Sequence, residues 1–95
     1  MKDQKKSEIV EKINELQKNI RDLGPVMRGS VTIMGKRHKQ PYFSVGIQKK
    51  TKVIYLGKKR EGKAREYLEN YKRLMQIVDE MTLLNMELLK LDVDG

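Results

Sequence analysis

Apolar residues recur at alternating spacings of four and three along the first part of the chain, and this heptad pattern constrains the fold more than any other feature. The residues concerned are Ile9, Ile13, Leu16, Ile20 and Leu23. Their spacing predicts a helix over residues 7–23 with a single apolar seam, begun by Ser7 and ended by Gly24-Pro25. Because a helix of this length is only marginally stable alone, the seam needs a partner.

A second, longer helix is predicted over residues 60–91. One apolar line along it consists of Leu74, Ile77, Met81, Leu84, Leu88 and Leu91. A second line beside the first consists of Tyr67, Tyr71, Leu74, Val78, Met81, Asn85 and Leu88. Two adjoining lines make an apolar face that is wider than one partner helix covers.

Between the predicted helices the pattern changes to that of β-strands. Residues 30–34, 42–48 and 52–56 are β-branched or alternate in polarity, and two polar connections, 35–41 and 49–51, separate them. These runs predict a three-stranded antiparallel β-meander over residues 30–57. The side expected to face a helix carries Phe43, Val45 and Ile47. The outward side is expected to carry Tyr42, Ser44, Gly46 and Gln48, with Lys52 and Ile54 beside them.

The pattern as a whole predicts an α+β fold in one domain, residues 1–95, with the two helices paired antiparallel as a coiled-coil-like stem. At 1.5 Å per residue, the first helix is too short to cover the last ten residues or so of the second. We therefore expect an uncovered apolar overhang at 81–91 that forms a homodimer or holds a larger protein partner. The residues expected at that interface are Met81, Leu84, Asn85, Leu88 and Leu91. Asn85 either sets the register of paired helices or lies at the solvent edge.

The net charge of +8 is unevenly distributed along the chain. Residues 1–27 carry +1, residues 28–65 carry twelve Lys and Arg against one Glu, and residues 66–95 carry −4. A basic segment between neutral and acidic ones is typical of a site for a polyanion. The alternative is that these lysines only keep exposed strands soluble and unpaired.

Nucleic acid is the partner that this basic segment favours, and double-stranded DNA more than RNA. A β-sheet can enter the major groove with outward side chains on base edges, while phosphate benefits from free N–H groups at a helix start. The expected base contacts are Tyr42, Ser44, Gln48 and Lys52. The expected phosphate contacts are Lys36, Arg37, Lys39, Lys49, Lys50, Lys58, Lys59 and Arg60. Arg28 and Lys63 are also expected to bind nucleic acid, and His38 is expected to contact a phosphate or a base. The alternatives are a subunit that binds structured RNA and an adaptor that acts through the C-terminal helix.

Catalysis has little to use in this sequence. The chain has no cysteine, a single histidine, His38, and no nucleophile, phosphate-loop or metal-binding motif. We therefore expect a protein that is not an enzyme and that uses no cofactor and no metal. No apolar run is long enough for a membrane span, and no signal peptide opens the chain, which favours a cytoplasmic protein, associated with the nucleoid if it binds DNA.

Several short segments resemble a family of short uncharacterised prokaryotic proteins that are often encoded with transposases and other mobile elements. The segments are Gly24-Pro25, Arg28-Gly29-Ser30, Pro41-Tyr42-Phe43, Tyr55-Leu56, residues 69–74 and Leu84-Asn85, within 23–90. The family usually carries cysteines before the Pro-Tyr pair, which suggest a metal knuckle. Residues 35–40 replace them here, so the resemblance implies no metal. The three strands and a helix are also similar in architecture to the arm-type DNA-binding domains of phage and transposon integrases, which use the exposed sheet face for DNA.

Overall fold

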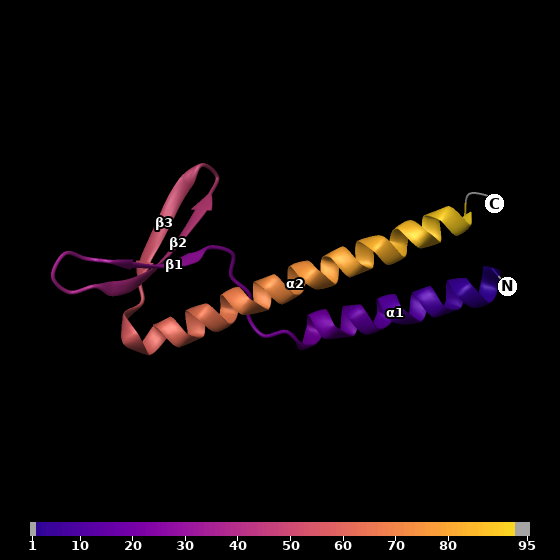
Figure 1. Cartoon of the computed structure of the whole chain (residues 1–95), viewed down its shortest axis with the longest axis horizontal. Helices are drawn as coiled ribbons and strands as arrows, with labels where there is room; N and C mark the ends of the chain where they lie inside the picture. Colours follow the sequence, from indigo (N-terminus) through magenta and orange to yellow (C-terminus); the bar gives the residue numbers. More distant parts are fainter. Residues whose placement is uncertain (1, 93–95) are drawn as a thin grey trace. The chain divides into compact units, whose positions relative to one another are not determined.

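The computed structural model describes residues 2–92, which form two helices and one three-stranded sheet (Figure 1). In chain order the elements are α1 (Lys2–Asp22), β1 (Ser30–Met34), β2 (Gln40–Ile47), β3 (Lys50–Tyr55) and α2 (Gly57–Asp92). The predicted α+β class and the order of the elements are confirmed. Both helices begin earlier than predicted, so that Ser7 lies inside α1 and does not cap it.

The chain divides into two compact units, where the sequence suggested one domain. The first unit, called the stem unit here, comprises residues 1–23 and 73–95, and the second, the sheet unit, comprises residues 24–72. Helix α2 contributes its C-terminal part to the stem unit and its N-terminal part to the sheet unit. The two parts of this helix therefore pack against different elements: its N-terminal part lies in the unit of the sheet, and its C-terminal part lies in the unit of α1.

In the stem unit, α1 and the C-terminal part of α2 run antiparallel (Figure 1). Ile9 and Ile13 of α1 and Ile77 of α2 are buried, and Leu16 and Ile20 are half-buried. These residues belong to the predicted seams, because residues three and four apart share one helix face. At the far end, Lys6 Nζ lies 3.2 Å from a carboxylate oxygen of Asp92. The coiled-coil-like pairing of the helices is confirmed.

The stretch 81–91, predicted as an uncovered overhang, is covered along one side of the helix and exposed along another, where Leu83, Met86 and Leu89 lie. Met81, Leu84, Leu88 and Leu91 are half-buried in the stem unit, and only Asn85 of the five expected interface residues is exposed. The prediction assumed that the first helix folds back over the start of the second. Instead the sheet occupies that part of α2, and α1 covers the C-terminal part.

In the sheet unit, strands β1, β2 and β3 form an antiparallel meander in that order. The buried core of this unit consists of Phe43 of β2, Leu56 between β3 and α2, and Ala64 of α2. The partly buried side chains packed against them are Met27, Val31, Val45 and Leu68. Because Ala64 has only a methyl group, the ring of Phe43 can approach the helix closely at this point.

Two hydrogen bonds hold the segment before β1 against α2 within the sheet unit. The Met27 amide donates to the Tyr67 carbonyl over 3.1 Å, and the Asn70 side-chain amide donates to the Pro25 carbonyl over 2.9 Å. Gly29 follows with φ +147°, and a Cβ there would stand 2.6 Å from the Ser44 carbonyl oxygen. A glycine is therefore required for β1 to enter the sheet at this place.

Candidate nucleic-acid interface

The strand register decides which side chains share the outward side of the sheet. Tyr42 pairs with Thr32 and Tyr55, and Ser44 pairs with Ser30 and Val53. Since side chains alternate along a strand and directly paired residues share a side, the outward side carries these six residues, Gly46 with its partner Thr51, and Gln40 with its partner Met34. We call this set the outward face.

Two of the expected neighbours of Tyr42 lie on the opposite side, and a third is not in a strand. Ile54 pairs with Phe43 and Lys52 pairs with Val45, so both lie on the helix-facing side. Gln48 lies in the turn between β2 and β3. The prediction assumed a three-residue connection, whereas the turn contains only Gln48 and Lys49, and a register change of one residue exchanges the two sides of a strand.

Tyr55 is a prominent aromatic group on the outward face, and the sequence analysis did not select it. Its ring meets that of Tyr42 edge to face, with centroids 5.4 Å apart and planes at 66°. Its hydroxyl donates to the side-chain carbonyl of Gln40 over 3.3 Å, and 48% of the residue is exposed. The sequence does not give the two-residue length of the turn after Ile47, and it is this length that places Tyr55 on the outward face.

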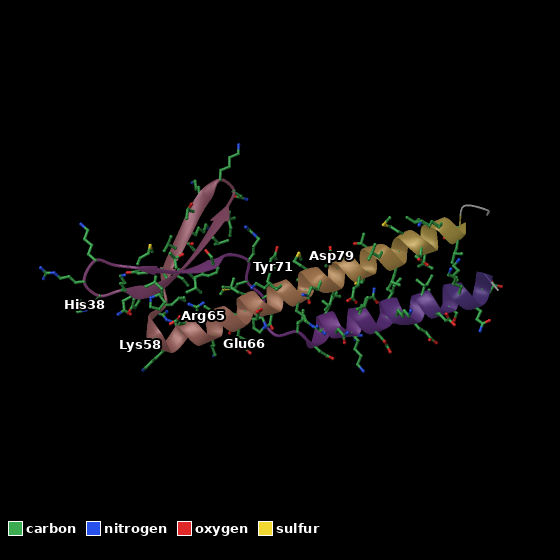
Figure 2. The ribbon with its side chains drawn as sticks, viewed as in Figure 1. His38, Lys58, Arg65, Glu66, Tyr71 and Asp79 are labelled. Atoms are coloured by element: carbon green, nitrogen blue, oxygen red, sulfur yellow. The ribbon has the colours of Figure 1, made fainter. Side chains whose placement is uncertain are left out.

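Exposed basic turns lie at both ends of β2. Lys36, Arg37, His38 and Lys39 occupy the connection from β1 to β2, and Figure 2 shows His38 directed away from the strands. Lys49 and Lys50 lie at the other end, where β2 turns into β3. Gln48 and Lys49 both have positive φ, 52° and 65°, which a two-residue hairpin turn requires and which asparagine and glycine adopt more easily.

The third basic group opens α2 and is adjacent to Tyr55. Lys58, Lys59 and Arg60 lie in the first turn of the helix, which contains no acidic residue, and Lys63 follows. A Cβ on Gly57 would stand 3.3 Å from the Tyr55 hydroxyl, so the start of α2 touches this ring. Tyr55 pairs with Tyr42, near the start of β2. The helix start therefore lies at the same end of the sheet as the turn that carries His38 (Figure 2).

Most of these cations have no carboxylate partner. The sheet unit contains thirteen Lys and Arg against three Glu, a net charge of +10, whereas the stem unit carries −2. Within the sheet unit, Arg65 pairs with Glu61 at 2.8 Å and Lys72 pairs with Glu69 at 4.0 Å. No other lysine or arginine of this unit pairs with a carboxylate among residues 3–92. Arg28 instead donates to the Gly46 carbonyl over 2.7 Å.

A hollow of about 390 Å³ lies between the start of β1 and α2 within the sheet unit. Val31, Leu68 and Tyr71 supply its apolar wall, and Arg28 and Lys72 supply cations. Tyr71 is half-buried and lines this hollow, while Leu68 packs against the core of the sheet unit. The position of Arg28 next to the hollow extends the basic surface along β1.

Among residues 2–92, no group of three or more histidine, cysteine and acidic side chains could hold a metal ion. Neither helix, over its described length, is long and apolar enough to cross a membrane. No protein-family model matches the chain, and neither the curated proteins nor the solved structures contain a match.

Proposed function

We propose that the sheet unit binds nucleic acid, with double-stranded DNA favoured over RNA. The observation that carries this proposal is the charge of the unit, +10 in 49 residues, on side chains that are mostly exposed and without carboxylate partners. A surface that lysines only keep soluble usually mixes both signs. Ten unbalanced charges repel one another, and a polyanion relieves that repulsion.

The arrangement of the basic groups supports binding across the outward face. The connection before β2 carries the four residues 36–39. At the other end of β2, Lys49 lies in the turn and Lys50 begins β3, and the outward face lies between these two basic groups. An eight-residue strand spans about 26 Å, more than the roughly 12 Å width of the DNA major groove. Phosphates would contact the two turns and the helix start, and Tyr42 and Ser44 would approach base edges.

The helix start gives this proposal a second argument. Lys58, Lys59 and Arg60 stand where the helix dipole repels positive charge, and no acidic residue in the first turn compensates them. Their position is unfavourable for stability and favourable for a bound phosphate, which also accepts bonds from the free N–H groups of the first turn. Function explains this placement better than solubility does.

The test is fluorescence anisotropy with duplex DNA, single-stranded DNA and a folded RNA, each at about 50 and 200 mM salt. If six to ten phosphates are contacted, duplex affinity should fall by roughly 10³–10⁵ over that range. Changing Lys49 and Lys50 to Glu should weaken binding to every duplex and reduce its salt dependence. The matched control changes Lys5 and Lys18 of the stem unit to Glu, the same change in net charge on exposed residues of the acidic unit. Equal loss in both variants would contradict the proposal.

Structured RNA is the second candidate, because one observation favours it. Tyr55 is an aromatic ring, about half exposed, on the outward face beside the basic helix start. Unpaired bases stack on such rings, and each stacked base contributes about 1–3 kcal/mol. Stronger binding to the folded RNA or to the single strand than to the duplex would select this alternative.

We also propose where this protein acts and with what kind of genetic element. A protein that binds duplex DNA would lie in the cytoplasm with the nucleoid, and the resemblance at Arg28-Gly29-Ser30 and Pro41-Tyr42-Phe43 supports an accessory factor of a mobile element. The adaptor alternative relied on the apolar overhang. Met81, Leu84, Leu88 and Leu91 of that stretch are half-buried in the stem unit. Leu83, Met86 and Leu89 are exposed, so an adaptor would have to bind its partner through these residues instead.

A further inference from the structure

The stem unit carries a second apolar surface that α1 does not cover. Its members are Met75, Val78, Met86 and Leu89 of α2, which are 37%, 40%, 48% and 68% exposed. With Thr82, which is also exposed, they form a continuous line that we call the outer stripe. At 3.6 residues per turn, the outer stripe lies about 130° around the helix from the seam that faces α1.

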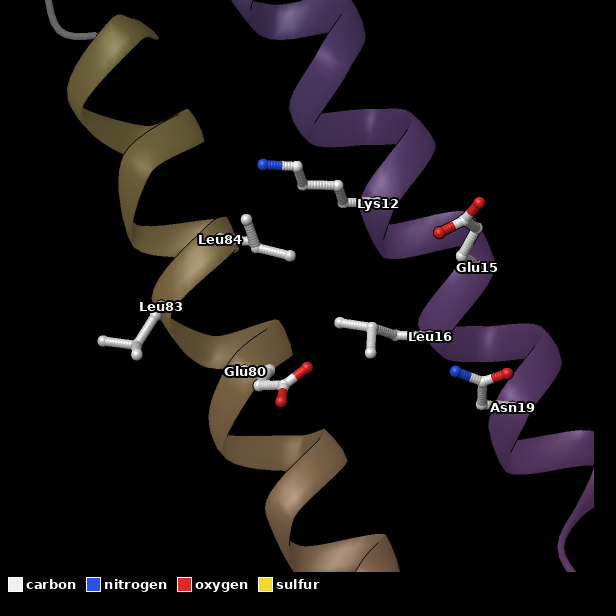
Figure 3. A pocket seen from close by; sticks show the side chains of 7 residues that line it. All are labelled: Lys12, Glu15, Leu16, Asn19, Glu80, Leu83 and Leu84. Atoms are coloured by element: carbon white, nitrogen blue, oxygen red, sulfur yellow. The ribbon is translucent and has the colours of Figure 1, made fainter.

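The close view of the stem unit shows the two sides of α2 directly. Leu84 points toward Leu16 of α1, whereas Leu83, one residue earlier, points away from α1 (Figure 3). Leu83 is 63% exposed and lies about 100° around the helix from the centre of the outer stripe. The seam residues of α2 therefore face α1, and the exposed apolar residues of this part of α2 lie on its other sides.

The spacing within the outer stripe is symmetric about Thr82. Val78 and Met86 lie four residues before and after it, and Met75 and Leu89 lie seven residues before and after it. An interface with a two-fold axis requires a surface that is complementary to itself, in which residue i of one copy meets residue j of the other and j meets i. An antiparallel second copy would place Val78 against Met86 and Met75 against Leu89, apolar against apolar in each case.

Thr82 can be covered at this axis without leaving a polar atom unpaired. Its hydroxyl donates to the Val78 carbonyl of its own helix over 2.8 Å. A buried hydroxyl without a partner is costly, and this bond removes that cost. The charges of the helix, such as Asp79, Glu80 and Glu87, lie outside the stripe, and the unit is acidic. A polyanion is therefore not a suitable occupant.

We infer that the outer stripe is the surface on which two copies of this chain associate, antiparallel, with the two-fold axis at Thr82. The stripe is about 21 Å long and a helix about 10 Å wide, so the two faces bury well under the roughly 1,200 Å² of a stable interface. The dimer is thus weak and reversible, and it forms at high protein concentration. It does not depend on the proposed nucleic-acid binding.

Cysteine cross-linking of the full chain tests this inference, because the natural sequence contains no cysteine. Oxidation of Thr82→Cys should give a covalent dimer, since the axis places this residue against its own copy. Val78→Cys alone and Met86→Cys alone should give little, because their copies lie about 12 Å apart along the axis. A mixture of the two should cross-link as a heterodimer. Gln17→Cys, on an exposed position of α1, measures random collision.

Each outcome of this experiment has a definite meaning. Covalent homodimers of Val78→Cys and of Met86→Cys, with no heterodimer in the mixture, would indicate parallel copies and overturn the inference. Cross-linking of Thr82→Cys no better than Gln17→Cys would overturn it as well. A second measurement, sedimentation equilibrium without nucleic acid, should show at least a tenfold weaker self-association for Leu89→Glu. Gln76→Glu, exposed but outside the stripe, should change it little, and equal effects in these two variants would also contradict the inference.

Discussion

The sheet unit and the stem unit share one continuous helix and have opposite surface chemistry. The sheet unit carries +10 and only a small buried core, whereas the stem unit carries −2 and pairs two heptad seams. Along α2 the change takes place near Lys72, where basic residues give way to an apolar and acidic sequence. One helix can therefore carry two different surfaces, because its N-terminal part packs in the sheet unit and its C-terminal part packs in the stem unit.

The first prediction removes the core of the sheet unit. Phe43→Ala should destabilise this unit by about 3–5 kcal/mol, because a buried aromatic ring is lost where Leu56 and Ala64 pack against it. Nucleic-acid binding should then be lost as well. Denaturant unfolding followed by circular dichroism measures the first effect, and anisotropy measures the second. Retained binding by an unfolded sheet unit would show that charge alone is sufficient.

The second prediction makes an equivalent change in the stem unit. Ile77→Ala should cost about 2–5 kcal/mol, because Ile77 is buried in the seam between α1 and α2. At a temperature where the variant is still folded, its affinity for duplex DNA should be unchanged. This variant is the matched comparison for Phe43→Ala, because each removes a buried side chain from one of the two units. If both lose binding equally, the two units do not divide the functions.

The third prediction concerns the exposed aromatic ring of the sheet unit. If unpaired bases stack on Tyr55, Tyr55→Leu should weaken binding to single strands or folded RNA by about 1–3 kcal/mol and affect duplex DNA less. Tyr55→Phe keeps the ring and removes only the hydroxyl that bonds Gln40, so it should behave almost like the natural protein. Anisotropy with the three nucleic acids distinguishes these cases. An equal effect on duplex DNA would instead place Tyr55 in the groove contact.

The smallest predicted effect is at Lys49, where one substitution should change stability and nucleic-acid affinity in opposite directions. Lys49 adopts φ 65°, a conformation that costs a residue with a side chain on the order of 1 kcal/mol. Lys49→Gly should therefore stabilise the hairpin slightly and weaken nucleic-acid binding several-fold. Thermal unfolding and anisotropy measure the two changes. Increased stability with unchanged affinity would remove this turn from the interface.

Much of this architecture could be predicted from local patterns. The seam residues Ile9, Ile13 and Ile77 are buried as their heptad spacing indicated, and the first predicted strand has the bounds of β1. The basic residues of both turns and of the helix start are exposed, as expected. These features depend on spacing and composition within short segments, which the sequence contains in full.

Two features of the fold could not be predicted from the sequence: the side of the sheet on which residues of β3 lie, and the part of α2 that packs against α1. The two-residue turn at Gln48–Lys49 placed Tyr55 on the outward face and Lys52 on the opposite side, because a register change of one residue exchanges the sides of a strand. The second feature, the packing of α1 against the C-terminal part of α2, covered Leu84 and Leu88 and left Leu89 exposed. The sequence by itself determined which residues form helices, strands and the basic segment. It left open which side of α2 packs against α1, because apolar residues occupy more than one side of this helix and only the packing within the stem unit distinguishes them.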